Sequence, residues 1–141
     1  MDIGELRRQA DSGSTVAQCV LGICYLDGID APVDYPEALR LLHAAVEGGA
    51  SRAMWNLARM YAEGLGTPKD MSRALELYES AALKGELAAQ IALGRLYSRG
   101  TDVPRNEQAA RHWYLIAAAQ ADRVDNESEI REARTYIRVH S

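Results

Sequence analysis

The segment LARMYAEGLGTPKDMSRALELYESAA at residues 57–82 decides the fold, because the chain contains two further copies of it. Residues 21–46 read LGICYLDGIDAPVDYPEALRLLHAAV, and residues 93–118 read LGRLYSRGTDVPRNEQAARHWYLIAA. Eight positions are identical in all three copies, at a period of 36 residues without a gap. Their first occurrences, two of which precede residue 21, are Gly13, Ala17, Leu21, Tyr25, Gly28, Pro32, Ala38 and Ala45. A fixed period of this length indicates a solenoid or array of repeated units.

Each copy predicts two helices. The first helix runs over roughly 14–27, 50–63 and 86–99, where the repeated residues at i, i+4 and i+8 form one apolar stripe. Its expected end is the glycine at 28, 64 and 100, since glycine readily takes a left-handed conformation. The second helix runs over roughly 34–47, 70–83 and 106–119, after a capping side chain at Asp34, Asp70 and Asn106. Small residues at 22, 58 and 94 predict close helix packing.

The two ends of the chain depart from this pattern. Residues 1–13 predict a helix that is the second half of an incomplete repeat and is closed by Gly13. The tail NESEIREARTYIRVHS breaks the register, and we predict a helix from about 126 to 139. Asn126 and Glu129 have the spacing of a capping box. Ile130, Ala133 and Ile137 form an apolar stripe that is expected to cover the last repeat.

These boundaries predict a single domain over residues 1–141. It divides into an N-terminal helix at 1–13, repeats at 14–49, 50–85 and 86–121, and a capping helix at 122–141. The net charge of −4 and pI of about 5.4 argue against non-specific nucleic-acid binding. No apolar run approaches the ~18 residues of a membrane span, and the polar start MDIGELRRQADSG lacks a signal-peptide core. We therefore expect a cytoplasmic protein without a membrane partner.

The two cysteines, Cys19 and Cys24, lie in one predicted helix. Five helical steps place them ~140° apart around the axis, so they cannot pair within that helix. We interpret both as small packing residues in a reducing compartment.

The three copies resemble Sel-one-like repeats, a branch of the tetratricopeptide-like solenoids. That family combines Leu-Gly-x-x-Tyr, a glycine-bearing loop, Asp-x-x-x-Ala and a closing Ala-Ala, and the resemblance covers about residues 10–120. Ala58 departs from the favoured glycine, and Leu42 stands where the other copies have Tyr78 and Tyr114. The resemblance implies an all-α, right-handed α/α superhelix of about eight helices. It also implies a scaffold or adaptor role, although some members bind β-lactams and others resemble immunity proteins.

No catalytic constellation is visible in the sequence. His43, His112 and His140 are scattered, without Cys, Asp or Glu at metal-ligand spacing. The glycines belong to the repeat rather than to a phosphate-binding loop, and no serine lies in a nucleophile elbow. We predict that the chain is not an enzyme and has no metal site or cofactor. Its repeated tyrosines are interpreted as core residues rather than a stacking platform for bases.

The resemblance to tetratricopeptide proteins also implies which positions face a partner, namely a set on the first helix of each pair. The first repeat supplies Val16, Cys19, Ile23, Leu26 and Asp27. The second supplies Arg52, Trp55, Arg59, Ala62 and Glu63, and the third Ala88, Ile91, Arg95, Ser98 and Arg99. From these we take Val16, Cys19, Ile23, Arg52, Trp55, Arg59, Glu63, Ile91, Arg95 and Arg99 as candidate partner-binding residues.

The resulting hypothesis is a concave groove in which four arginines surround Trp55. Such a groove favours an acidic or carboxylate-bearing peptide with an apolar anchor. The alternative is a solvated charge network in which Glu63 pairs with Arg59, Arg95 or Arg99 and Trp55 fills space.

We predict a protein-interaction module or adaptor that binds a protein or acidic peptide. The second hypothesis is an immunity or antagonist protein that occludes a toxin or effector. The third is a protein that binds or hydrolyses β-lactams, which rests on the resemblance alone. The sequence does not fix the oligomeric state.

Overall fold

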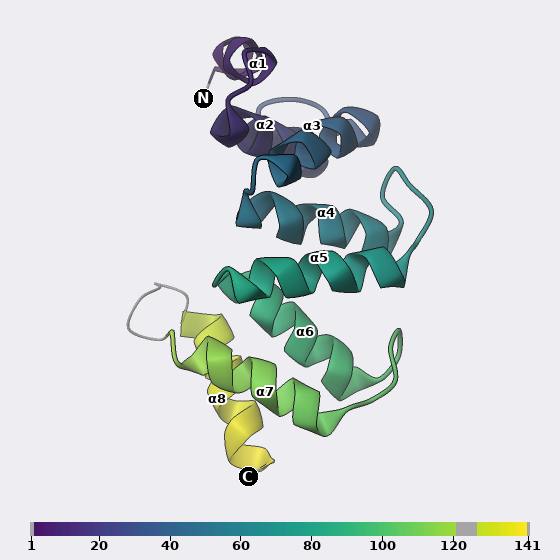
Figure 1. Cartoon of the computed structure of the whole chain (residues 1–141), viewed down its shortest axis with the longest axis vertical. Coiled ribbons are helices and arrows are strands. Elements are labelled where there is room, and N and C mark those ends of the chain that lie inside the picture. The colour runs from purple at the N-terminus through teal and green to yellow at the C-terminus, as the bar shows by residue number, and fades with distance from the viewer. Residues whose placement is uncertain (1, 121–126, 141) are drawn as a thin grey trace. The chain divides into compact units, whose positions relative to one another are not determined.

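The structure is a computed structural model that describes residues 2–120 and 127–140 (Figure 1). Within these residues the secondary structure is all helical, with eight helices as predicted. They are α1 (Ile3–Asp11), α2 (Thr15–Asp27), α3 (Tyr35–Glu47), α4 (Ser51–Glu63), α5 (Met71–Leu83), α6 (Leu87–Arg99), α7 (Glu107–Ala118) and α8 (Glu127–Val139). The six helices of the three repeats each begin within one residue of the predicted start.

The chain divides into two compact units. Unit 1 is Met1–Leu77 and unit 2 is Tyr78–Ser141, so the division falls inside α5. Each unit has its own packed helices, and each is described by itself below.

The loop inside each repeat has the same hydrogen bonds in all three copies. Gly28, Gly64 and Gly100 end the first helix of each pair with φ of 69°, 69° and 67°. Six residues later, the amides of Asp34, Asp70 and Asn106 donate to the carbonyls of Tyr25, Tyr61 and Tyr97, each at 2.9 Å. The side chains of these same three residues accept from the amide three residues on, at 3.0–3.2 Å. The predicted glycine ends and side-chain caps are therefore confirmed.

Gly64 provides a test of this loop. Its φ of 69° lies in the left-handed region, which a β-branched residue adopts only under strain. Gly64→Val is expected to lower the free energy of unfolding by about 1–2 kcal/mol in urea denaturation. Gly64→Asn is the matched control, because asparagine tolerates this conformation, and equal stability of the two variants would contradict the prediction.

The turn between repeats shows that α1 is the second half of an incomplete repeat. Gly13, Gly49 and Gly85 have φ of 96°, 86° and 91°. After each glycine the next amide donates to the carbonyl five residues earlier, at 3.1, 3.1 and 3.0 Å. Arg7 in α1 also donates to the Tyr25 hydroxyl at 2.7 Å, as His43 in α3 contacts the Tyr61 hydroxyl at 3.0 Å. Because these pairs are one repeat apart, α1 relates to α2 as α3 relates to α4.

Small residues allow the helices to approach closely in both units. A Cβ added to Gly22 in unit 1 would lie 2.9 Å from the Leu42 side chain. A Cβ added to Gly94 in unit 2 would lie 2.7 Å from the ring of Tyr114. The repeated leucines and alanines are buried, but Tyr25 and Tyr97 are only partly buried. In unit 1 the hydroxyls of Tyr25 and Tyr61 reach α1 and α3, the helices that precede their own repeats.

The C-terminal helix α8 covers unit 2 with the predicted apolar stripe. Ile130 and Ala133 are buried in a cluster with residues of α6 and α7, and Ile137 packs against that cluster. The other buried members are Leu87, Ile91, Tyr114 and Ala117. Asn126 lies outside the described residues, so the capping box that it was predicted to form with Glu129 remains a prediction.

Candidate partner-binding surfaces

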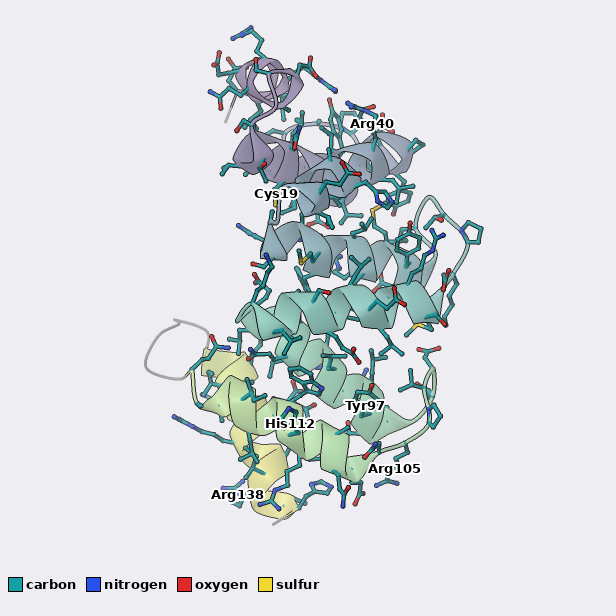
Figure 2. The ribbon with its side chains drawn as sticks, viewed as in Figure 1. Cys19, Arg40, Tyr97, Arg105, His112 and Arg138 are labelled. Atoms are coloured by element: carbon teal, nitrogen blue, oxygen red, sulfur yellow. The ribbon has the colours of Figure 1, made fainter. Side chains whose placement is uncertain are left out.

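Seven of the ten candidate residues lie in unit 1, on two helices that contact each other, α2 and α4. We call this the α2–α4 surface; it comprises Val16, Cys19, Ile23, Arg52, Trp55, Arg59 and Glu63. Val16 is 74% exposed, and Arg52 and Glu63 are also exposed. Ile23, Trp55 and Arg59 are half-buried. Cys19 is buried, on the side of α2 that faces α4 (Figure 2).

A shallow, mainly apolar hollow of about 370 Å³ lies at the N-terminal ends of α2 and α4. Val16, Cys19, Val20 and Arg52 line it, together with the turn at residues 48–51. Arg52 forms no ion pair within the described part of the chain. The first turn of α4 lacks a side-chain cap at Ala50, whereas Ser14 caps α2. The hollow therefore combines an apolar floor with a positive rim.

Arg59 is held in place by three neighbours in the same unit. Its Nη1 donates to the side-chain oxygen of Asn56 at 3.0 Å, and its guanidinium lies 5.2 Å from the centre of the Trp55 ring. Its Nη2 is 3.6 Å from a carboxylate oxygen of Asp27 in α2. The partner of Arg59 is thus Asp27, and the predicted pairing with Glu63 within α4 is not what the structure shows.

Asn56 was not among the predicted site residues. Its side chain is 1% exposed, and its amide nitrogen donates to the Arg52 carbonyl at 2.9 Å. The remaining oxygen then orients Arg59. The signal in the sequence was a polar residue at a repeat position that holds Val20 and Ala92 in the other copies.

In unit 2 the structure corrects one of the three candidate positions, Ile91, and gives a second, Arg95, a partner within the unit. Ile91 is 1% exposed and packs in the cluster beneath α8, so it is a core residue and not an open groove residue. Arg95 is bound by Glu132 of α8: its Nε lies 3.1 and 3.0 Å from the two carboxylate oxygens, and its Nη2 lies 2.9 Å from one of them. Glu132 raises the pKa of Arg95, and this arginine joins α8 to α6. Arg99 is exposed.

The predicted cluster of four arginines around Trp55 draws on both units, so it stays a prediction. Arg52, Arg59 and Trp55 belong to unit 1, whereas Arg95 and Arg99 belong to unit 2. Within unit 1, two arginines and Trp55 share the α2–α4 surface. Within unit 2, the arginines of α6 lie beside a helix that was predicted only as a cap.

That helix forms a groove which the sequence did not reveal. The α8 groove has a volume of about 490 Å³ and is lined by Tyr114, Arg131, Glu132, Thr135, Tyr136, Val139 and His140. The rings of Tyr114 and Tyr136 are 4.7 Å apart, and His140 stacks on Tyr136 at 3.9 Å. Burial raises the pKa of Tyr114, as does the nearby Glu132, so this phenol stays neutral. Val139 is 68% exposed at the C-terminal end of the groove.

The described residues contain no group of three or more His, Cys, Asp or Glu side chains placed to hold a metal ion. Cys19 and Cys24 are reduced and buried, and burial raises the pKa of the Cys24 thiol, which disfavours the reactive thiolate. Among these residues, no helix combines the length and the hydropathy that a membrane span requires.

Comparisons with known proteins agree with the repeat structure. A sequence model of the Sel1 repeat matches residues 15–49, 51–86 and 87–122. The crystal structure of a Sel1 repeat protein from Oxalobacter formigenes is 39% identical, covering 95% of this chain and 98% of that chain with a TM-score of 0.74. The structure of c5321, a protective antigen of uropathogenic Escherichia coli strains with an SLR fold, is 35% identical over 88% of this chain, with a TM-score of 0.77.

The chain spans 26% of the length of that antigen. A comparison with curated protein sequences gives no match. The repeat match and the solved structures confirm the predicted all-α, tetratricopeptide-like solenoid fold.

Proposed function

This chain belongs to the Sel1 repeat family, and we propose that it is a protein-interaction module whose α2–α4 surface binds an acidic segment of a partner protein. Sel1 repeat proteins are generally protein-interaction modules and typically non-catalytic scaffolds.

The observation that carries the proposal is the hollow beside Arg52. An exposed arginine without an ion pair in the described residues stands at the rim of an apolar hollow. A carboxylate at the rim would gain charge-assisted hydrogen bonds from Arg52, whose planar guanidinium suits two-point binding. An apolar side chain from the same segment would fill the hollow against Val16 and Val20.

Trp55 and Arg59 extend this surface along α4. Asn56 fixes the guanidinium over the indole ring, so the pair needs little ordering when a partner arrives. Tryptophan and arginine are also the residues most enriched among strong interface contacts. The ion pair with Asp27 at 3.6 Å is partly exposed, and such pairs are weak enough for a partner carboxylate to compete.

We also propose that the protein is not an enzyme and that it acts in the cytoplasm. Sel1 repeat proteins are typically non-catalytic scaffolds, and the reduced, buried Cys19 and Cys24 suit a reducing compartment.

Panning a random peptide library against the purified chain tests the proposed site. We expect enriched peptides that combine carboxylates with one large apolar residue. Arg52→Glu should weaken their binding by at least tenfold, and Trp55→Ala by about 2 kcal/mol, measured by fluorescence anisotropy. Binding should also weaken as salt rises, because exposed charges are screened over ~8–10 Å.

Arg8→Glu in α1 is the matched control, since it makes the same charge change at an exposed site of unit 1 away from α4. Peptides without acidic residues, or peptides that bind the Arg52→Glu variant as tightly as the unmodified chain, would contradict the proposal.

A further inference from the structure

We infer that the α8 groove is a second docking surface, one that accepts an acidic segment of a partner protein carrying an aromatic or aliphatic side chain. It lies entirely in unit 2 and shares no residue with the α2–α4 surface. A chain with two such surfaces would engage its partner or partners at two separate points.

The wall of the groove is built to receive a flat or branched apolar group. Tyr114, Tyr136 and His140 form a row of rings: Tyr114 packs at a tilt of 34° against Tyr136, and His140 stacks on Tyr136, with ring centres 4.7 and 3.9 Å apart. The row is anchored at both ends: Tyr114 is 3% exposed in the core, and the His140 ring nitrogen bonds the Tyr136 carbonyl at 2.9 Å. Val139 then offers an exposed aliphatic surface beside the rings. Rings held in this way lose little freedom on binding.

The charges around the groove select an acidic partner. The one carboxylate in the wall, Glu132, is neutralised by Arg95 at 2.9 Å. Arg131 lines the groove, and Arg99 is close enough to Tyr114 to lower the pKa of its phenol, opposing the effect of burial. Neither arginine forms an ion pair within the residues that the structure describes. The groove therefore presents apolar surface with an excess of positive charge.

A second copy of the chain does not fit this groove. Two α8 grooves facing each other across a two-fold axis would bring their Arg131 side chains together, and like charges oppose that pairing. Helix α1 of another copy lacks both the acidic charge and the apolar group, because Glu5 and Asp11 are balanced by Arg7 and Arg8 and its apolar residues pack against the core beside α2. A segment of a different protein that supplies both carboxylates and an apolar side chain would match the positive charge and the apolar wall of the groove.

Backbone amide NMR of the full chain with three capped peptides, EEWEE, EEAEE and KKWKK, tests this inference. We expect EEWEE to shift the signals of Tyr136, Val139 and His140 in a saturable manner, and the other two peptides to bind at least tenfold more weakly. Val139→Glu should remove these shifts, because it places a carboxylate in the groove mouth. Leu83→Glu is the matched control, since Leu83 is an apolar residue of unit 2 that is 80% exposed and does not line the groove.

The Arg52→Glu variant separates this inference from the proposed function. It should abolish shifts in α2 and α4 and leave those of α8 unchanged, whereas Val139→Glu should do the reverse. Equal binding of EEWEE and KKWKK, or shifts in α8 that persist in Val139→Glu, would overturn the inference. Binding of the α8 residues to vesicles containing phosphatidylserine, without response to EEWEE, would also overturn it in favour of a lipid surface.

Discussion

Replacing Ile130 with aspartate is expected to destabilise unit 2 strongly while unit 1 keeps its stability. Ile130 is 5% exposed in the cluster that joins α8 to α6 and α7. The change removes about 1.5–3 kcal/mol of apolar burial and places a carboxyl group where the surrounding side chains are apolar. A loss of about 4 kcal/mol would be a large fraction of the 5–15 kcal/mol typical of a domain.

The two tryptophans allow each unit to be followed by itself. Trp55 lies in unit 1 and Trp113 lies in unit 2, so a Trp55→Phe background leaves Trp113 as the reporter for unit 2. Urea titration followed by Trp113 fluorescence should show a midpoint well below that of the parent. Thr135→Asp is the matched control, because it adds the same carboxyl group at an exposed position of α8. If both variants unfold at the same urea concentration, α8 does not support unit 2.

Because of the repeat, the helices and their boundaries could be predicted from the sequence almost to the residue. The same glycine or capping side chain occurs at the corresponding helix end in all three repeats. Each boundary was therefore predicted from three independent occurrences and not from one. The structure reproduces these ends because the same backbone hydrogen bonds recur, such as the three at 2.9 Å from the capping residue to the tyrosine carbonyl. Identical chemistry at a fixed period leaves little freedom for the local structure.

The candidate site was only partly readable, because the prediction rested on a rule for internal repeats. The rule places first-helix positions on an open face, and it holds for Val16 and Arg52 in unit 1. It fails for Cys19 and Ile91, which are both buried, the second of them beneath α8. Arg95 is exposed as the rule expects, but α8 supplies it with an ion-pair partner, Glu132. The tail showed an apolar stripe and hence a covering helix, but its broken register did not show which face of the last repeat it would occupy.

Tyr114 is a further residue whose surroundings the repeat pattern did not predict in full. Tyrosines at repeated positions were predicted to be core residues, and Tyr114 is 3% exposed as expected. Its ring nevertheless forms part of the α8 groove, because Tyr136 packs beside it at 4.7 Å. A repeat position has the same local role in every copy, but what lies beyond the last copy decides whether that residue also borders a surface.

Gly94→Val is expected to be the most damaging change at a single small residue of unit 2. A Cβ at this position would lie 2.7 Å from Cζ of Tyr114 and 2.8 Å from both neighbouring ring carbons, well inside normal contact distance. The ring has little room to move, because it is buried and packed against Tyr136. Overpacking of this kind costs about 1–3 kcal/mol or more, and the few tenths gained in helix propensity over glycine do not offset it.

A double-mutant cycle shows whether the ring is the cause. Tyr114→Ala alone should destabilise unit 2 by leaving a cavity, but in that background Gly94→Val should lose most of its effect, giving a coupling free energy above about 1 kcal/mol. The readout is again the urea midpoint of Trp113 fluorescence in the Trp55→Phe background. Ala92→Val is the matched control, since it introduces valine on a half-exposed side of the same helix. Additive effects of Gly94→Val and Tyr114→Ala would show that contact between residue 94 and the Tyr114 ring does not set the spacing of α6 and α7.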